Sequence, residues 1–217
     1  MSRNEPRSLD HAVRLAADVQ AYLESACERI EVAGSIRRHR SMVSDIELVV
    51  VPRFEVLSEH DLWGERVGAT VDVLEERVAH LIAHERLRLR DVTVERRDGT
   101  TEFQKRNGPA YKALEYAGMA IDLFIVRPPA TWGVIFGLRT GPGDWNTKLV
   151  MDCKAIGRRV EGGQVLAWRG ASSSWEPVPT PTERDFFAAI GQEWIDPLER
   201  RVNRVRIQRA IAAAVPA

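Results

Sequence analysis

The sequence predicts an α+β fold, in which helices and strands are mixed along the chain. Two β-branched apolar runs, 45–51 and 119–126, are typical of buried strands. Other segments keep the apolar spacing of amphipathic helices. Asp98-Gly99, between two stretches of strand-like composition, predicts the tight turn of a hairpin.

In the N-terminal part of the chain, helices are expected on either side of the first strands. Ser8 is a suitable N-cap for a helix whose apolar residues recur on or near one face as far as Cys27. A short strand is predicted over 30–34. Apolar residues within 67–83 keep roughly helical spacing, which predicts a second helix.

The character of the sequence changes at 140–143 (Thr-Gly-Pro-Gly), where we place a domain boundary between 1–139 and 140–217. Beyond it we expect a helix near 145–156 and then short strands. Thr180-Pro-Thr-Glu183 predicts the start of a helix, with Thr180 as the cap and Glu183 completing a capping box. Gly191 would end that helix.

Composition excludes several classes of protein. The 217 residues suffice for one large or two small domains, and 44% hydrophobic with 29% charged residues is typical of globular proteins. The 31 basic and 31 acidic residues cancel, so affinity for nucleic acid must come from local patches. Neither a membrane span nor a signal peptide is evident, and the two cysteines indicate no disulfide framework. We expect a cytoplasmic monomer without a membrane partner.

Three carboxylates form the first candidate site. Asp45 and Glu47 lie two residues apart on a predicted strand and so project from the same face. Asp122 stands alone between apolar neighbours in the second buried strand, where a lone carboxylate is costly unless it is paired or metal-bound. If the strands lie side by side, the three could hold two Mg²⁺ ions, or Mn²⁺ in their place. The alternative for Asp45 and Glu47 is a solvated strand edge.

A glycine-serine-arginine segment forms the second candidate site. Gly34 would let the backbone approach a phosphate closely, and Ser35 can donate from both its hydroxyl and its amide. Arg37 and Arg38 carry planar guanidinium groups that suit phosphate oxygens. The alternative is a tight turn with solvated arginines. Together with the carboxylates, the segment predicts binding of a nucleoside triphosphate.

These motifs resemble those of the nucleotidyltransferase superfamily and, more narrowly, the family X (polymerase-beta-like) DNA polymerases. Several spaced segments in the same order carry the resemblance, which extends over nearly the whole chain. They are Gly34-Ser35-x-Arg37-Arg38, Asp45-x-Glu47, Asp122, and the segments 139–146, 176–187 and 195–201. We expect a minimal form that lacks the family's N-terminal lyase domain.

The resemblance implies a nucleotidyltransferase palm with a mixed, mainly antiparallel sheet and flanking helices, plus a small α+β C-terminal lobe that closes over the nucleotide. It implies that Asp45 and Glu47 bind both metal ions. Asp122 would bind the catalytic ion and accept the proton of the primer 3′-hydroxyl. The implied nucleotide-binding residues are Gly34, Ser35, Arg37, Arg38, Leu138, Arg139, Gly141, Trp145 and Asn146.

The implied activity is the transfer of a nucleoside monophosphate from a (d)NTP to the 3′-hydroxyl of primer or gapped DNA, with release of pyrophosphate. Repair, or the DNA metabolism of phages and mobile elements, is the expected setting. Two alternatives remain open: a nucleotidyltransferase acting on a small molecule, an RNA end or a protein, and a non-catalytic nucleic-acid-binding module.

The sequence also departs from the family pattern. Glu47 stands where the family usually has aspartate, and Ala120 replaces an arginine near the primer end. Leu138-Arg139 replaces the aromatic pair that screens the sugar of the nucleotide. The choice between ribose and deoxyribose is therefore not predicted.

Basic residues outside these motifs are candidates for contact with nucleic acid. Lys105, Arg106 and Lys112 lie with an aromatic residue just before the third carboxylate strand, where they would contact phosphates. The alternative is a solvated hairpin end. A second candidate is the arginine-rich segment 200–209, for which a solvated terminal helix is at least as good an interpretation. His80 and His84 have a zinc-compatible spacing, but a plain surface pair is favoured.

Overall fold

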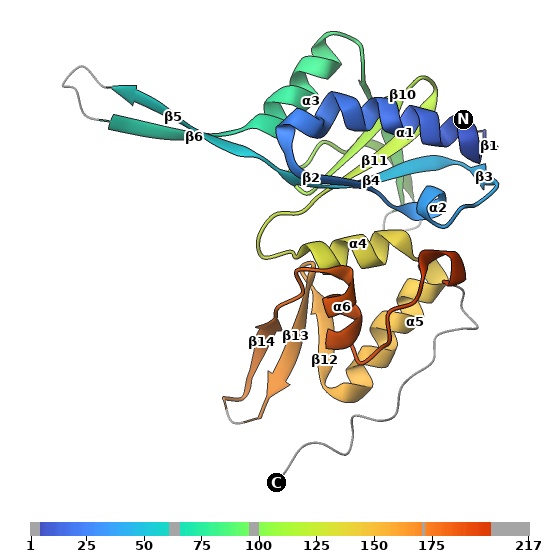
Figure 1. The fold of residues 1–217 in the computed structure, drawn as a ribbon, viewed down its shortest axis with the longest axis vertical. Helices are drawn as coiled ribbons and strands as arrows, with labels where there is room; N and C mark the ends of the chain where they lie inside the picture. The colour runs from blue at the N-terminus through green and yellow to red at the C-terminus, as the bar shows by residue number, and fades with distance from the viewer. Residues whose placement is uncertain (1–4, 61–65, 96–99, 171, 201–217) are drawn as a thin grey trace. The chain divides into compact units, whose positions relative to one another are not determined.

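The computed structural model describes residues 5–60, 66–95, 100–170 and 172–200. They form a mixed α+β protein whose sheets are mainly antiparallel (Figure 1), which confirms the predicted fold class. Contacts between Cα atoms divide the chain into two compact units. We call Met1–Val32 with Met42–Ile125 the N-terminal unit, and Ala33–Ser41 with Val126–Ala217 the C-terminal unit. The domains 1–139 and 140–217, predicted from the change in sequence character at 140–143, stay a prediction.

A five-stranded sheet lies at the centre of the described part of the N-terminal unit. Its one parallel pair joins β4 to β11, and the other neighbours are antiparallel. The two buried strands predicted from sequence are thus confirmed, and they lie side by side. In spatial order the strands are β2 (Cys27–Val32), β4 (Asp45–Pro52), β11 (Met119–Ile125), β10 (Tyr111–Tyr116) and β7 (Arg88–Leu89).

The predicted strand over 30–34 is wrong at its end. β2 stops at Val32, and Gly34 begins the short helix α2 (Gly34–Arg37) instead. The φ angle of Gly34 is 61°, a left-handed conformation that side chains disfavour and that turns the chain out of the strand direction. Glycine therefore serves here to start a new element.

Two helices flank the sheet of the N-terminal unit, and Figure 1 shows them on the same side of it. Helix α1 (Leu9–Leu23) is followed by the short 3-10 turn η1 (Glu24–Ala26). Ser8 is the N-cap of α1, as predicted, and its side chain accepts a hydrogen bond from the His11 amide. Its apolar face is buried, which anchors the helix. No helix within the described ranges is long and apolar enough to cross a membrane.

The second predicted helix begins later than expected. Helix α3 spans Val73–Ala83, and Asp72 caps it by accepting from the Glu75 amide. Residues assigned to the start of the helix belong to strand β6 (Arg66–Asp72), which pairs with β5 (Phe54–His60). Valine and threonine favour strands, and pairing with β5 stabilises this segment as a strand despite its roughly helical spacing of apolar residues.

Two-stranded ribbons complete the described part of the N-terminal unit. Figure 1 shows the ribbon of β5 and β6 extending away from the central sheet. The expected hairpin is present as an antiparallel pair, although its Asp-Gly turn lies outside the described residues. The remaining ribbons are β8 (Asp91–Glu95) with β9 (Thr101–Lys105), and β1 (Arg7–Ser8) with β3 (Met42–Val43).

The C-terminal unit packs helices against a three-stranded antiparallel sheet in its described part. Its core includes Trp145, Leu149, Val165, Phe186 and Phe187, which are all fully buried. Besides α2, its elements are α4 (Trp132–Thr140), α5 (Gly143–Cys153), η2 (Lys154–Ile156), β12 (Arg158–Glu161), β13 (Gln164–Arg169), β14 (Ser174–Val178), α6 (Glu183–Ala189) and η3 (Pro197–Glu199).

Helix α6 has a capping box, but it lies two residues later than predicted. Thr182 is the cap: its side chain accepts from the Asp185 amide, and Asp185 accepts from the Thr182 amide. The hydroxyl of Thr180 is instead within 2.6 Å of the Thr131 hydroxyl, so it is bonded elsewhere. Glu183 is therefore not part of the capping box; it forms an ion pair with Arg37, described below.

Both cysteines are free thiols held in environments that keep them protonated. Burial raises the pKa of Cys27 to about 12, with Asp72 acting in the same direction and Arg53 against it. Burial also raises the pKa of Cys153, whose side chain is inaccessible in the core of the C-terminal unit. Because the thiolate is the reactive form, both thiols should be inert near neutral pH.

We expect the folded protein to react with DTNB at about pH 8 at least roughly a hundredfold more slowly than the protein unfolded in guanidinium chloride. The measurement is the release of the coloured thiolate over time in the two conditions. Rapid reaction of one full equivalent in native buffer would contradict the described environments of Cys27 and Cys153.

Candidate functional site

The three predicted carboxylates share one face of the sheet in the N-terminal unit. The parallel register of β4 and β11 places Glu47 opposite Asp122. Asp45 lies two residues before Glu47, so its side chain points to the same face. Ile46 and Leu48 point to the opposite face and are fully buried. The pairing of two strands distant in sequence therefore creates an acidic strip.

Asp122 has a counter-ion that no sequence motif indicated. Nη2 of Arg90 lies 2.5 Å from Oδ1 of Asp122, and the hydroxyl of Tyr111 donates to the same oxygen at 2.8 Å. Arg90 is placed by its amide, which donates to the carbonyl of Ala113. The ring of Tyr111 is stacked on Phe124 at a centroid distance of 5.2 Å. An ion pair thus explains how a lone carboxylate is tolerated in an apolar strand.

The acidic strip has the right type of ligand for a metal ion, but its side chains are not grouped around one point. Three carboxylates offer the hard oxygen ligands that Mg²⁺ and Mn²⁺ prefer. In the described residues, however, no three Asp, Glu, His or Cys side chains are grouped so that they could hold a metal. Oδ1 of Asp122 is bonded to Arg90 and Tyr111 instead. The metal assignment stays a prediction.

The Gly34–Arg38 segment belongs to the C-terminal unit and contains a buried hydroxyl, that of Ser35. Oγ of Ser35 is buried and has no hydrogen-bond partner among the described residues. The next side chain, Ile36, is buried and anchors the turn. Since buried polar atoms are nearly always hydrogen-bonded, Ser35 Oγ is a suitable donor to an added group.

Arg37 is a partly buried ion-pair residue, so the alternative of two solvated arginines does not hold. Its Nη1 and Nη2 donate to the two carboxylate oxygens of Glu183 at 2.8 and 2.9 Å. Nη1 also donates to the Thr140 hydroxyl at 2.7 Å, and the guanidinium lies 4.0 Å from the centre of the Phe136 ring. Arg38 donates to the carbonyl of Thr140 at 2.5 Å. Both arginines are thereby tied to the end of α4.

Glu183 is the centre of a buried ionic cluster. Besides Arg37 it accepts hydrogen bonds from Nη1 of Arg200 at 2.8 Å and from the indole of Trp194 at 2.9 Å. Burial by itself would raise the pKa of Glu183, but the bonds from the two arginines and the indole hold it at about 2. Arg200 is only 2% exposed. Sequence reasoning missed this role because it treated Glu183 as a capping residue.

The predicted nucleotide-facing segment forms a tight turn between α4 and α5. A Cβ atom on Gly141 would lie 2.5 Å from Cε3 of Trp145 and closer still to Oδ1 of Asn146, so only glycine fits. The Asn146 amide donates to the carbonyls of Leu138 and Gly141. Trp145 is fully buried against Phe187, which makes it a core residue. Arg139, by contrast, is exposed.

The three predicted nucleic-acid contacts fall into two environments. Lys105 and Arg106 are exposed. Lys112 is 1% exposed, and its ammonium donates to Glu75 at 2.8 Å and to Asn107 at 2.7 Å. It therefore holds β10 to α3 inside the N-terminal unit. The arginine-rich segment beyond residue 200 lies outside the described residues.

The fold and the site define an α+β protein with an acidic strip on one sheet and a separate arginine–glutamate cluster. No model of a known protein family matches the chain, and no curated protein matches it. Its function is therefore inferred from its own residues and their chemistry.

Proposed function

We propose that the protein is a nucleotidyltransferase of the family X DNA polymerase type, built on a nucleotidyltransferase palm. It would transfer a nucleoside monophosphate from a (d)NTP to the 3′-hydroxyl of a primer. The observation that carries the proposal is the parallel pairing of β4 with β11, which aligns Glu47 with Asp122 and brings Asp45 to the same face. Such an acidic strip suits the chemistry of phosphoryl transfer.

In this reaction the primer oxygen forms a bond to the α-phosphorus, and the bond from that phosphorus to the bridging oxygen of pyrophosphate breaks. When bound at the carboxylates, Mg²⁺ or Mn²⁺ would stabilise the charge that develops on the phosphates. We assign the retention of both ions to Asp45 and Glu47, and that of the catalytic ion to Asp122 as well. Asp122 accepts the proton of the hydroxyl, and the pair with Arg90 compensates its charge in the protein without substrate.

We assign the triphosphate to Ser35 and Arg38. The buried hydroxyl of Ser35, which lacks a partner among the described residues, supports this assignment. We assign Arg37 a structural role and no contact with the triphosphate, because both of its terminal nitrogens are bonded to Glu183. It fixes the turn that presents its two neighbours.

For the nucleic acid we propose primer or gapped DNA, contacted by Lys105 and Arg106. Both side chains are exposed, follow directly one after the other and are free of the burial that holds Lys112. Cationic side chains of this kind contact phosphates without reading sequence. We assign Lys112 to the stability of the N-terminal unit.

The test is a primer-extension assay with a labelled primer, alone or annealed beside a gap, and with dNTPs or NTPs. We expect the primer to lengthen with Mg²⁺ or Mn²⁺, with one pyrophosphate released per nucleotide, and to remain unchanged when EDTA removes the ions. Failure to extend every primer with either ion would overturn the polymerase assignment. Release of pyrophosphate with a small-molecule, RNA or protein acceptor only would replace it by the alternative transferase.

A further inference from the structure

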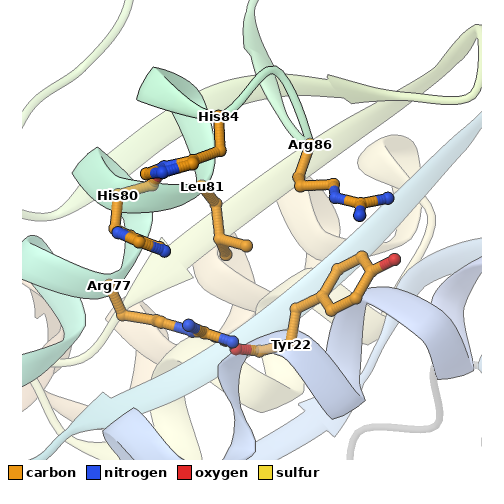
Figure 2. A pocket seen from close by; sticks show the side chains of 6 residues that line it. All are labelled: Tyr22, Arg77, His80, Leu81, His84 and Arg86. Carbon is orange, nitrogen blue, oxygen red and sulfur yellow. Dashed lines mark hydrogen bonds between the residues drawn. The ribbon is translucent and has the colours of Figure 1, made fainter.

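The N-terminal unit contains a pocket of about 360 Å³ that shares no residue with the acidic strip (Figure 2). Helices α1 and α3 and the loop after α3 supply its walls. Although acidic and basic residues are equal in number in the chain, none of the described residues that line this pocket is acidic. Its lining residues are Tyr22, Arg77, His80, Leu81, His84 and Arg86.

Helix α3 and its C-cap residue, His84, form one wall of the pocket, because the helical repeat places their side chains on one face. Arg77, His80, Leu81 and His84 follow one another at spacings that place them on the same helical face. Figure 2 shows the two imidazole rings one above the other, with centroids 4.1 Å apart. Leu81 is 4% exposed and supplies an apolar floor. This part of the pocket is therefore set by the helix itself.

The loop after α3 brings a second arginine to the pocket. Glu85 adopts a φ angle of 54°, which reverses the chain just beyond the helix. The amides of Arg86 and Leu87 then donate to the carbonyl of Leu81, and the Leu87 side chain is fully buried. Figure 2 shows Arg86 and Arg77 on two sides of the pocket, with Leu81 between them. The two arginines thus line the pocket from different sides.

Hydrogen bonds hold the other wall in place. Nε of Arg77 donates to the carbonyl of Tyr22 at 2.8 Å, in the last turn of α1. The Tyr22 ring meets Tyr116 edge-on, with centroids 5.7 Å apart. The bond to the end of α1 accounts for Arg77, and Nδ1 of His84 lies 2.9 Å from the carbonyl of His80. Neither bond accounts for Arg86 or for the ring of His80. A pocket ordered in advance loses less side-chain entropy when a ligand binds.

We propose that this pocket binds a phosphate group. Arg77 and Arg86 compensate the charge of the phosphate, and the His80 ring and Nε2 of His84 donate to its oxygens. Tyr22 and Leu81 contact the less polar part of the ligand. The histidine pair alone would also suit a divalent metal, but the two arginines that line the same pocket repel a cation and attract an anion. The ligand is therefore an anion, carried either by a small phosphorylated molecule or by a nucleic-acid backbone.

The test is a titration of the full chain with inorganic phosphate, followed by NMR of labelled histidine side chains without nucleotide substrate or primer. We expect saturable shifts of the His80 and His84 signals. Arg86→Gln should weaken binding about tenfold or more, because a charge-assisted bond is lost. Arg14→Gln, an exposed arginine of α1 outside the pocket, should bind like the wild type. His84→Gln provides a second variant if Arg86→Gln unfolds.

Parallel titrations with a nucleoside monophosphate and with a short DNA duplex identify the source of the phosphate. Tighter binding of the monophosphate indicates a small ligand, and tighter binding of the duplex indicates a backbone phosphate. Equal affinity of the Arg86→Gln and Arg14→Gln variants would overturn the proposal, as would a response of the histidines to Zn²⁺ but not to phosphate. Because no catalysis is measured, a failure here is distinguishable from a failure of the proposed transferase activity.

Discussion

Asp122→Asn is expected to lower the rate of nucleotide addition by roughly a thousandfold or more. Asparagine has nearly the same shape, so Tyr111 and Arg90 can still donate to its oxygen. It has lost the negative charge that the proposed reaction requires for holding an ion and taking a proton. The measurement is a single-turnover primer extension at saturating nucleotide and Mg²⁺.

The matched control for this variant is Glu28→Gln. Glu28 is an exposed carboxylate on β2 of the same sheet, outside the acidic strip, and its replacement should leave the rate unchanged. Thermal unfolding of both variants establishes that the comparison is between folded proteins. A rate for Asp122→Asn within about tenfold of the wild type would remove Asp122 from the proposed mechanism.

Glu183→Gln is expected to lower the free energy of unfolding of the C-terminal unit by roughly 3–5 kcal/mol, as is typical when one partner of a buried ion pair is removed. Its carboxylate accepts bonds from Arg37, Arg200 and the indole of Trp194. A neutral glutamine leaves the buried guanidinium of Arg200 and the partly buried one of Arg37 without a counter-charge. Urea unfolding followed by tryptophan fluorescence measures the change.

Glu176→Gln serves as the control in the same unit. Glu176 pairs with Arg169 at 3.3 Å, but its side chain is 50% exposed, so the loss should be below about 1 kcal/mol. Equal destabilisation by the two substitutions would contradict the central role of Glu183.

The same carboxylate predicts how stability depends on pH. The pKa of Glu183 is about 2 in the folded protein, below its ordinary value of 4.5. Its contribution is therefore fully present above about pH 4.5 and is lost as the pH falls toward about 2, by an amount on the order of 3 kcal/mol. The difference in stability between wild type and Glu183→Gln should be constant at neutral pH and shrink in acid.

Several elements were predictable because their causes are local. The β-branched runs of β4 and β11 and the Ser8 cap of α1 depend on neighbouring residues, and both predictions are confirmed. The start of α3 was wrong because Val67 to Val71 combine approximate helical spacing with strand-favouring side chains. These residues pair with β5 as a strand instead of extending the helix.

The candidate site shows the same division. That Asp45 and Glu47 share a face follows from the two-residue period of a strand, whatever the rest of the fold. Their alignment with Asp122 depends on which strands become neighbours. The ion pair of Asp122 depends on Arg90, which directly follows the short strand β7 and belongs to no sequence motif. The sequence supplied candidates, and long-range pairing selected their partners.

Arg37 and Glu183 give the clearest instance. From the local sequence, Arg37 was predicted to bind phosphate and Glu183 to cap a helix, because a local pattern indicates only what a side chain is able to do. They are 146 residues apart, and the fold brings them within hydrogen-bond distance. A buried charge must be compensated by whichever opposite charge is near it. The sequence alone thus established the two buried strands, the Ser8 cap and the acidic pair, whereas the three-dimensional fold determined the counter-ion of each buried charge.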